Sequence, residues 1–498
     1  MKRERRRVAR ERRRVGGVSA IALLVSSATF GCHVVSGIDD LSLREDAELE
    51  FFETFSGVAS EDVRAVSFGD ESILVAGTFG ATIAAGDDTL STTASEDTFV
   101  VRLDDAGEVN DAFTLLATEW ARPVSLHGPL LTGRFAGDIV VGGAQLTAPA
   151  SEPRIFLADL SATPAFAPLT LGGEGFTPYG NAVDVARDGS GNIVIGGGFR
   201  GTLELPGDTS ACPPFESGSS NSNLFLASFA PDANDTGALE CRWSFHPRSS
   251  DTQLVESVAY DLGGSLVVGG EFVGKLELPG AAALESTGGV DFFLARIDPD
   301  MKVVYAMSFG DGQGVQRSLR VSAHLYGNVA IAGYFEGRID FGGGPIESSQ
   351  GPDIVVAKYG PSGKHLFTRH LPVNLGVCAP ASCSLHGLDV AFDAQGNVLV
   401  ASAFSGKLEI AGVTLESASD DRAEHFLAKL NPDGELLWSG RFGGAEKACD
   451  PGPCPVALAV DDASHVLSGG FFDGLAELGD TKLESTGPRD AFVARFLP

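Results

Sequence analysis

Methionine and basic residues are scarce in this chain of 498 residues. Only three methionines occur, against 63 glycines and 25 prolines, and no long stretch shows the 3.6-residue apolar period of an amphipathic helix. These absences exclude a helical bundle. Lysine and arginine number 36 against 66 acidic residues, a formal net charge of −30. This charge argues against a nucleic-acid binder, which needs a basic face to neutralise phosphates.

Recognisable catalytic and metal-binding motifs are also absent. The sequence has no His-Glu-x-x-His, no Gly-x-Ser-x-Gly and no Asp-x-Asp-x-Asp-Gly loop, and its nine histidines are scattered. The stretch Gly269–Leu276 imitates a phosphate-binding loop, but Leu276 stands where a hydroxyl would hold magnesium. We therefore expect no enzyme activity, no cofactor and no metal. The acidic excess is interpreted as a solvated surface that keeps an exported protein soluble.

What the sequence does contain is a motif repeated seven times. Each copy ends a run of β-forming residues in an aromatic residue and then turns at or near a glycine. Successive copies lie about 65 residues apart, which is typical of a repeat architecture. The seven aromatic residues are Phe79, Phe135, Phe199, Phe272, Phe335, Phe404 and Phe472.

Each repeat is predicted to form four strands joined by short turns. In the third repeat, Ala182–Ala186 is the first strand, Asp188–Asn192 is a tight turn, and Asn192–Phe199 is the second strand. A short Gly-x-Leu-x-Leu element follows in most repeats. The third strand is clearest as Asp291–Ile297, and the fourth, after a Pro-Asp-Gly turn, as Leu436–Phe442.

Radial stacking of seven such units predicts an all-β, seven-bladed β-propeller over residues 48–498. Stacking would bury both faces of the inner strands, which explains their nearly continuous apolar runs. The last repeat stops at Phe496, after its third strand, and the missing fourth strand is present at the start: Glu48–Gly57 aligns with Glu435–Gly444. We expect this N-terminal strand to complete the last blade and close the ring, removing an exposed sheet edge.

Recurrent acids and bases of the third strand are interpreted as turn caps and structural ion pairs, because they occur in most blades. Function is better sought where the repeat is broken. The breaks are the insertion Pro206–Asn223 and two cysteine-containing loops that should emerge at one end of the ring. These loops either stiffen the surface or frame a binding site near the central channel. The recurrent pairs are Asp97/Arg102, Asp291/Arg296 and Asp490/Arg495.

The N-terminus has the layout of an export signal. A basic run, Met1–Arg14, precedes a short apolar stretch that is too short to span a membrane. Thr29-Phe30-Gly31-Cys32 looks like a lipobox, which predicts cleavage after residues 1–31 and lipidation of Cys32. Cleavage after Ala28 is the alternative. Residues 32–47 are then a tether.

Six further cysteines fall into pairs. An export signal implies an oxidising compartment, so the pairs are predicted to be disulfides. Zinc binding by the two Cys-x4-Cys loops is the alternative, although no histidine cluster accompanies them. The predicted pairs are Cys212 with Cys241, Cys378 with Cys383, and Cys449 with Cys454.

The repeat patterns Gly-x-Phe-x-Gly, Asp-x-Phe-Leu-Ala-Arg-Leu and Trp-Ser-x-x-Phe-Gly-Gly resemble those of a known family. They are similar to the long-repeat, SBBP-type β-propeller lipoproteins of bacterial cell surfaces, of the myxobacterial type. Repeat two departs most, with Pro153 and Ala167 at pattern positions. The resemblance implies a fold and a location, and no chemistry.

The function predicted from these features is a non-enzymatic binding or scaffold module at the cell surface. We expect a monomer, held to the outer membrane or cell surface only by its lipid anchor, with a protein or glycan as partner and no nucleic acid. Without lipidation it would be secreted or periplasmic. Two alternatives stay open: an exported glycan-active or lyase-type propeller with carboxylates at the channel mouth, and a purely structural envelope protein.

Overall fold

The computed structural model describes residues 48–498 except a set of short internal segments. The described residues form strands and no helix, as the composition predicts. The predicted signal, tether and lipidation site, Cys32, lie outside the described residues. The internal segments left out are 70–71, 208–209, 218–220, 233–236, 248, 313, 315, 350, 375–386, 418–422, 446–454 and 479–480.

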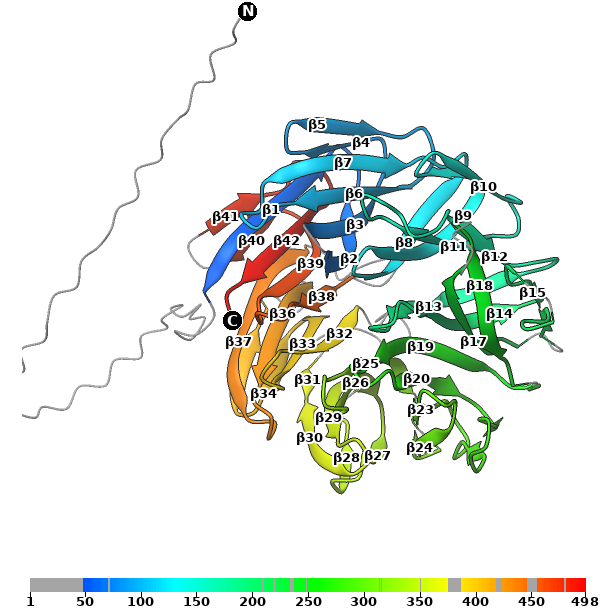
Figure 1. Cartoon of the computed structure of the whole chain (residues 1–498). Helices are drawn as coiled ribbons and strands as arrows, with labels where there is room; N and C mark the ends of the chain where they lie inside the picture. The colour runs from blue at the N-terminus through cyan, green and yellow to red at the C-terminus, as the bar shows by residue number, and fades with distance from the viewer. Residues whose placement is uncertain are drawn as a thin grey trace, which may run out of the picture. The chain divides into compact units, whose positions relative to one another are not determined.

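The described strands form seven antiparallel blades of four main strands each, the arrangement of a β-propeller (Figure 1). The prediction of seven blades is confirmed. Blade 1 consists of β2 (Asp62–Phe68), β3 (Ile73–Phe79), β6 (Asp97–Leu103) and β7 (Val109–Leu115). Blade 2 consists of β8 (Trp120–His127), β9 (Leu130–Val141), β11 (Arg154–Asp159) and β12 (Leu169–Leu171). Blade 3 consists of β13 (Thr177–Arg187), β14 (Ile193–Arg200), β17 (Asn223–Pro231) and β18 (Leu239–Phe245).

The remaining blades follow the same order along the chain. Blade 4 consists of β19 (Gln253–Tyr260), β20 (Leu266–Phe272), β23 (Asp291–Ile297) and β24 (Val303–Phe309). Blade 5 consists of β25 (Gln316–Ala323), β26 (Val329–Phe335), β29 (Asp353–Tyr359) and β30 (His365–Leu371). Blade 6 consists of β32 (Leu388–Phe392), β33 (Val398–Phe404), β36 (Ala423–Leu430) and β37 (Leu436–Ala445). Blade 7 is β38 (Ala457–Val460), β39 (Val466–Phe472), β42 (Asp490–Phe496) and β1 (Leu49–Gly57).

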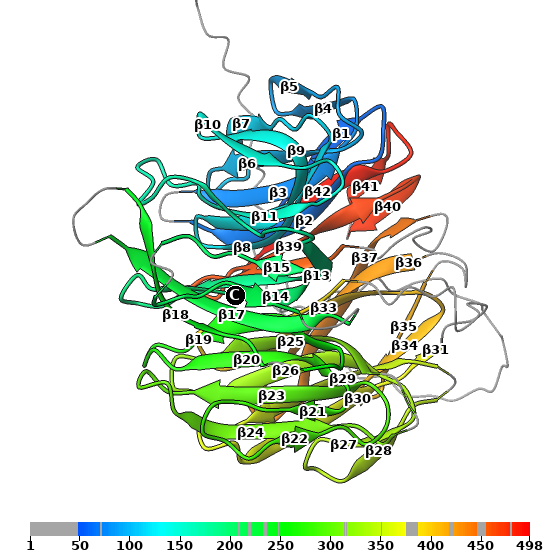
Figure 2. The same ribbon diagram turned by 90° about the vertical axis from the view of Figure 1, so that its right-hand side faces the viewer.

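The blades form a closed ring. The first strand of each blade contacts the first strand of the next, and β38 of blade 7 contacts β2 of blade 1. These seven first strands are therefore innermost and surround the channel. Figure 2, turned by 90°, shows strands of blades 3, 4 and 5 one beside the next.

The ring closes through the N-terminal strand, as predicted. β1 pairs with β42 in antiparallel register, with Phe52 opposite Ala494. The Phe52 ring stacks on Phe492 at 5.2 Å, and Phe55 is fully buried. The amide of Leu497 donates to the Glu48 carbonyl over 2.8 Å, so the two ends of the propeller lie side by side.

The two glycines of the repeated motif have different reasons to be there. The first lies inside the second strand: a Cβ on Gly77 would come within 2.5 Å of the Phe99 ring and 2.0 Å of the Asp62 carbonyl. The second supplies the positive φ of the turn, +81° at Gly201 and +87° at Gly337. The glycines thus permit close packing as well as the turn.

The Gly-x-Leu-x-Leu element is the first strand of a small outer hairpin. These hairpins sit between the second and third strands of their blades, and the short sequence pattern alone did not show the partner strand. Six of them are β4 (Thr82–Ala85) with β5 (Asp88–Ser91), β15 (Thr202–Leu203) with β16 (Phe215–Glu216), β21 (Lys275–Leu276) with β22 (Leu284–Glu285), β27 (Arg338–Asp340) with β28 (Pro345–Glu347), β34 (Lys407–Ile410) with β35 (Val413–Glu416), and β40 (Leu475–Leu478) with β41 (Thr481–Glu484). In blade 2, β10 (Ala144–Ala148) pairs with the end of β9, and β31 (Val373–Asn374) joins β34.

The ring has two faces, which differ in their connections. We call the end at which the inner strands begin the mouth face, and the end at which they finish the turn face. The turn face carries the first-to-second-strand turns, such as Asp188–Asn192, and the third-to-fourth-strand turns. Because neighbouring strands are antiparallel, β42 ends and β1 begins on the turn face.

Candidate functional site

The channel is lined by one equivalent residue from each inner strand. Each lies opposite a residue of the second strand that precedes the phenylalanine of the repeated motif by three positions, as the pairing of Asp184 with Gly196 and of Arg320 with Ala332 shows. Together they surround a narrow cavity of about 90 Å³. The seven residues are Ala65, Ser125, Asp184, Ser257, Arg320, Asp389 and Ala457.

The polar channel residues join neighbouring blades. Asp184 accepts hydrogen bonds from Ser125 Oγ and, over 2.8 Å, from the Val258 amide of the next blade. Asp389 likewise accepts from the Leu458 amide of its next blade over 3.1 Å. Burial raises the pKa of Asp389 to about 6, although nearby Arg320 opposes the shift. These acids therefore hold the inner ring together.

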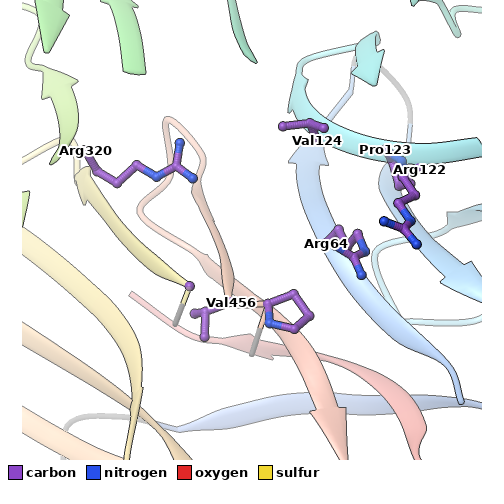
Figure 3. Close-up of a pocket in the computed structure, with 8 residues that line it drawn as sticks. Arg64, Arg122, Pro123, Val124, Arg320 and Val456 are labelled. Atoms are coloured by element: carbon purple, nitrogen blue, oxygen red, sulfur yellow. The ribbon is translucent and has the colours of Figure 1, made fainter. Parts of the chain in front are cut away.

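Three arginines lie at the mouth face of this channel. A pocket of about 70 Å³ is lined by Arg64 of β2, Arg122 of β8 and Arg320 of β25. Figure 3 shows Arg64 and Arg122 on one side of the pocket and Arg320 across from them. This convergence stands out in a protein with a formal charge of −30.

Two of the mouth arginines are oriented by carboxylates. Arg64 forms two 3.0 Å bonds to Asp62, and Arg122 Nε lies 2.6 Å from Glu96. Arg122 also lies over the Trp120 ring at 5.2 Å, and its side chain is 43% exposed. A guanidinium has five N–H donors, so these contacts leave others directed at the pocket.

The third mouth arginine is held by backbone carbonyls. Arg320 Nη1 donates to the Glu256 carbonyl over 2.9 Å, and Nε donates to the Leu388 carbonyl over 3.2 Å. These acceptors come from the blades on either side of blade 5. Arg320 therefore brings its charge to the mouth without a carboxylate in direct contact among the described residues.

The mouth pocket has a volume of about 70 Å³ and opens to solvent. A carboxylate or a sulfate group fits in it. Arginine binds both groups well because its planar fork offers paired donors. The mouth is therefore suited to one anionic substituent of a larger ligand.

A pair of carboxyl groups lies beside Arg320 in the seam between blades 4 and 5. Glu256 and Glu271 are hydrogen-bonded to each other, and the Ser318 amide donates to Glu271 Oε1 over 2.7 Å. Burial and the neighbouring Glu256 raise the pKa of Glu271 well above its usual range, and burial also raises that of Glu256. Two carboxyl groups that hydrogen-bond to each other must share a proton.

The structure describes two of the six cysteines that were predicted to form disulfides. Cys212 and Cys241 form the predicted disulfide, which ties the insertion of repeat three to β18. Cys378, Cys383, Cys449 and Cys454 lie outside the described residues. Gly387 and Pro455, the first described residues after the two cysteine loops, both line the mouth pocket.

The recurrent acids and bases of the third strand have the predicted structural roles. Asp291 accepts a 2.9 Å hydrogen bond from the Thr287 amide, and Asp97 accepts one of the same length from Ala117. Arg296 pairs with Asp261. The first position caps turns on the mouth face, and the arginine position bridges turns on the opposite face.

The mouth arginines and the Glu256–Glu271 pair were not singled out in the sequence. Each lies on an inner or second strand at a position where the blades differ in residue type. An alignment of the inner and second strands across the seven repeats carries this signal. It is weaker than the signals from the loop insertions and from the residues that most blades share.

Two features are absent from the described residues. No group of three or more His, Cys, Asp or Glu side chains in the described part of the chain is arranged to hold a metal ion. Over the same residues, no helix is long and apolar enough to cross a bilayer.

Comparisons with known proteins match the fold only. No family model and no curated protein matches the chain. Among solved structures, it is similar to the polysaccharide lyase Uly1, with 9% identity, 90% of this chain and 99% of that chain covered, and a TM-score of 0.41. A PL25 ulvan lyase is 10% identical, with 72% of this chain and 80% of that chain covered and a TM-score of 0.36. Trypanosoma rangeli sialidase is 10% identical, with 88% of this chain and 55% of that chain covered and a TM-score of 0.31. At such identities and TM-scores, none of these activities extends to this chain.

Proposed function

We propose that this protein is an exported binding module whose channel mouth takes a carboxylate or sulfate group of an acidic glycan. The observation that carries the proposal is the convergence of Arg64, Arg122 and Arg320 on one small pocket. The pocket would take the anionic group, and the rest of the glycan would lie across the mouth face. Residues that border the two cysteine loops are part of the same rim.

Arginines in a strongly acidic protein give the site selectivity. The acidic surface repels polyanions in general, and only the mouth offers paired donors at a fixed geometry. A glycan with spaced carboxylates or sulfates can approach there, whereas a densely charged nucleic acid is repelled elsewhere on the surface. The site is thus expected to bind weakly to moderately and with clear salt dependence.

Binding of defined polysaccharides to the full chain tests this function. Polygalacturonate should bind, and neutral dextran should not. Arg122→Gln should weaken binding at least tenfold, because the Arg122 side chain is 43% exposed at the mouth. Arg338→Gln removes an exposed arginine from an outer hairpin and is the charge-matched control. Equal loss in both variants, or equal binding of neutral dextran, would contradict the proposal.

A second candidate function, an exported glycan-active enzyme, has one specific observation in its favour. Burial raises the pKa of Glu271 well above its usual range, and Glu271 is hydrogen-bonded to Glu256, so the pair has the chemistry of a general acid. Glu256 lies close to Arg320, which lines the mouth.

Product formation separates the two functions. The full chain, incubated with the same acidic polysaccharide, would release new reducing ends if the pair is catalytic. Glu271→Gln would then abolish release and leave polysaccharide binding intact. A binding module would show no release, and Glu271→Gln would change only its stability.

We further propose that the protein is a lipid-anchored monomer of the outer membrane or cell surface. The lipobox-like Thr29–Cys32 and the resemblance to SBBP-type surface lipoproteins support this location. Mass spectrometry of the mature N-terminus is the test: a lipid-modified Cys32 is expected, whereas an unmodified Thr29 would show ordinary cleavage after Ala28.

A further inference from the structure

A basic side chain bridges neighbouring blades at most seams of the turn face. It stands at the sixth position of the third strand and reaches toward the turns of the next blade. We call these contacts basic bridges. The sixth position is occupied by Arg102, Asp159, Ser228, Arg296, Lys358, Lys429 and Arg495 in blades 1 to 7.

The seam between blades 4 and 5 shows the bridge in full. Arg296 pairs with Asp261, in the first turn of its own blade, and donates to the Pro361 carbonyl, in the third-to-fourth-strand turn of blade 5. A Cβ on Gly327, in the first turn of blade 5, would come within 2.8 Å of the same guanidinium. The arginine therefore fills the space between three turns.

Lysine makes the same bridge between blades 5 and 6. Lys358 Nζ donates to the Gly396 carbonyl over 2.9 Å and to the Pro432 carbonyl over 3.2 Å. It also lies 5.3 Å from the centre of the Phe392 ring, at the end of the next inner strand. Carbonyls, a carboxylate and an aromatic face are thus the recurrent partners of the bridging cation.

Blade 3 has Ser228 at this position, and its seam with blade 4 is open. A groove of about 580 Å³ occupies the place of the bridge. Its walls include Asp188, Tyr260, Gly264 and Pro299, the counterparts of the groups that surround the cation at other seams. The groove therefore has the surroundings of the bridging cation at other seams, but blade 3 has Ser228 where those blades have a basic side chain.

The Asp188 carboxylate is prepared for a cation that the described residues do not supply. Its Oδ1 accepts from the Asn192 amide over 2.8 Å, and its Oδ2 accepts from Asn192 Nδ2 over 2.7 Å. Asp393 in blade 6 makes the same two bonds to Asn397 and, in addition, pairs with Lys429 Nζ at 3.0 Å. Among the described residues, no basic side chain forms an ion pair with Asp188.

The remaining walls of the groove indicate a peptide. Leu262 is 70% exposed and Met301 is 36% exposed, and both lie at the groove with the half-buried Trp243. Arg242 also lines the groove, but its guanidinium is 3.4 Å from Glu240. An apolar rim around an acidic, aromatic floor suits a basic side chain flanked by apolar residues.

We propose that this groove is a docking site for a lysine or arginine side chain of a partner protein. The partner's cation takes the place of the missing basic bridge: it pairs with Asp188, lies against Tyr260 and donates to the carbonyls of the blade 4 turns. Neighbouring apolar residues of the partner cover Leu262 and Met301. The site lies on the turn face and is independent of the arginine mouth.

Calorimetric titration of the full chain with short peptides tests this site. The probe is acetyl-Leu-Arg-Leu-amide, and its control contains citrulline, which has the shape of arginine without the charge. We expect the arginine peptide to bind at least tenfold more tightly. Equal affinity of the two peptides, or no measurable binding of either to the wild-type chain, would overturn the proposal.

Variants of the groove make the test specific. Ser228→Arg should restore the internal bridge and abolish peptide binding, whereas Ser228→Ala leaves the groove open and should bind as wild type does. Asp188→Asn should weaken binding at least tenfold, and Glu347→Gln, an exposed acid elsewhere, should not. Thermal melting of each variant shows that it is folded. Undiminished binding by folded Ser228→Arg and Asp188→Asn would refute the site.

Discussion

The seam between blades 7 and 1 and the seam between blades 3 and 4 follow one plan and differ in one side chain. At the first, Arg495 lies 3.1 Å from Glu50, donates to the Asp105 carbonyl over 2.8 Å, and lies over the Phe68 ring. At the second, Ser228 is hydrogen-bonded to Tyr260 of blade 4 but carries no charge, and a groove remains.

The bridged seam between blades 7 and 1 contributes to stability, whereas the open seam between blades 3 and 4 is available for binding. The seam between blades 7 and 1 borders the blade in which the first strand of the chain pairs with the last, so its contacts support the closure of the ring. The open seam is flanked by strands that are already paired within complete blades. It can therefore give up its bridge and expose polar groups at a modest cost in stability.

Removal of the closing strand should have the largest effect. Deletion of residues 48–57 exposes the edge of β42 and removes Phe52 and Phe55 from the core. We expect a cooperative loss of fold, seen as the disappearance of the thermal transition in circular dichroism. Deletion of residues 33–47 is the control. An unchanged melting temperature without residues 48–57 would show that β1 does not close the ring.

Arg495→Ala should be the next most damaging change. The side chain of Arg495 is only 6% exposed, and its removal leaves Glu50 and Asp461 without their cation. The arginine is buried but the Glu50 side chain is 33% exposed, so the loss should be about 1–2 kcal/mol, between the values for surface and buried pairs. Urea unfolding measures the loss, with Ser228→Ala at the open seam as the comparison. Similar losses in the two variants would remove the distinction between the seams.

Glu61→Gln should change how stability depends on pH. Glu61 is fully buried beside the closing strand, and burial together with Asp490 raises its pKa to about 8 from an ordinary value near 4.5. The folded protein therefore retains a proton that the unfolded chain has lost. Wild-type stability should fall by about 2 kcal/mol between pH 6 and 8 from this group.

The Gln variant lacks this titration, so its free energy of unfolding should stay flatter over the same range. Urea unfolding at pH 6, 7 and 8 makes the comparison, and Glu347→Gln serves as the exposed control. Parallel curves for wild type and Glu61→Gln would show that Glu61 is ionised in the folded state.

Ser228→Arg should have the smallest effect on stability, and in the opposite direction. The new arginine can reach Asp188 and the Pro299 carbonyl, at a partly exposed site where an ion pair contributes less than about 1 kcal/mol. The expected result is a rise of a few degrees or less in melting temperature. A clear fall would indicate that the groove cannot accommodate the bridge.

Most of the fold follows from the sequence, because its cause is periodic. Seven copies of one strand pattern determine seven blades, and the alignment of Glu48–Gly57 with Glu435–Gly444 is enough to predict the closure. The outer hairpins were only half predicted, since their second strands, such as Leu284–Glu285, are too short to stand out.

The candidate sites were harder to predict, because they depend on differences between copies. Arg64, Arg122 and Arg320 are far apart in the sequence and meet only when the ring closes. Ser228 is visible as a departure from the Ala-Arg-Ile pattern, but a missing side chain indicates a groove only once the partners of Arg296 are known. The proton shared by Glu256 and Glu271 depends on burial that no local pattern reports.

The meeting of the two chain ends has a consequence for orientation. Glu48 and Leu497 are joined by a hydrogen bond on the turn face. A protein fused at residue 48 or after Pro498 would therefore extend from that face, which also carries the groove, and would leave the arginine mouth on the opposite face uncovered.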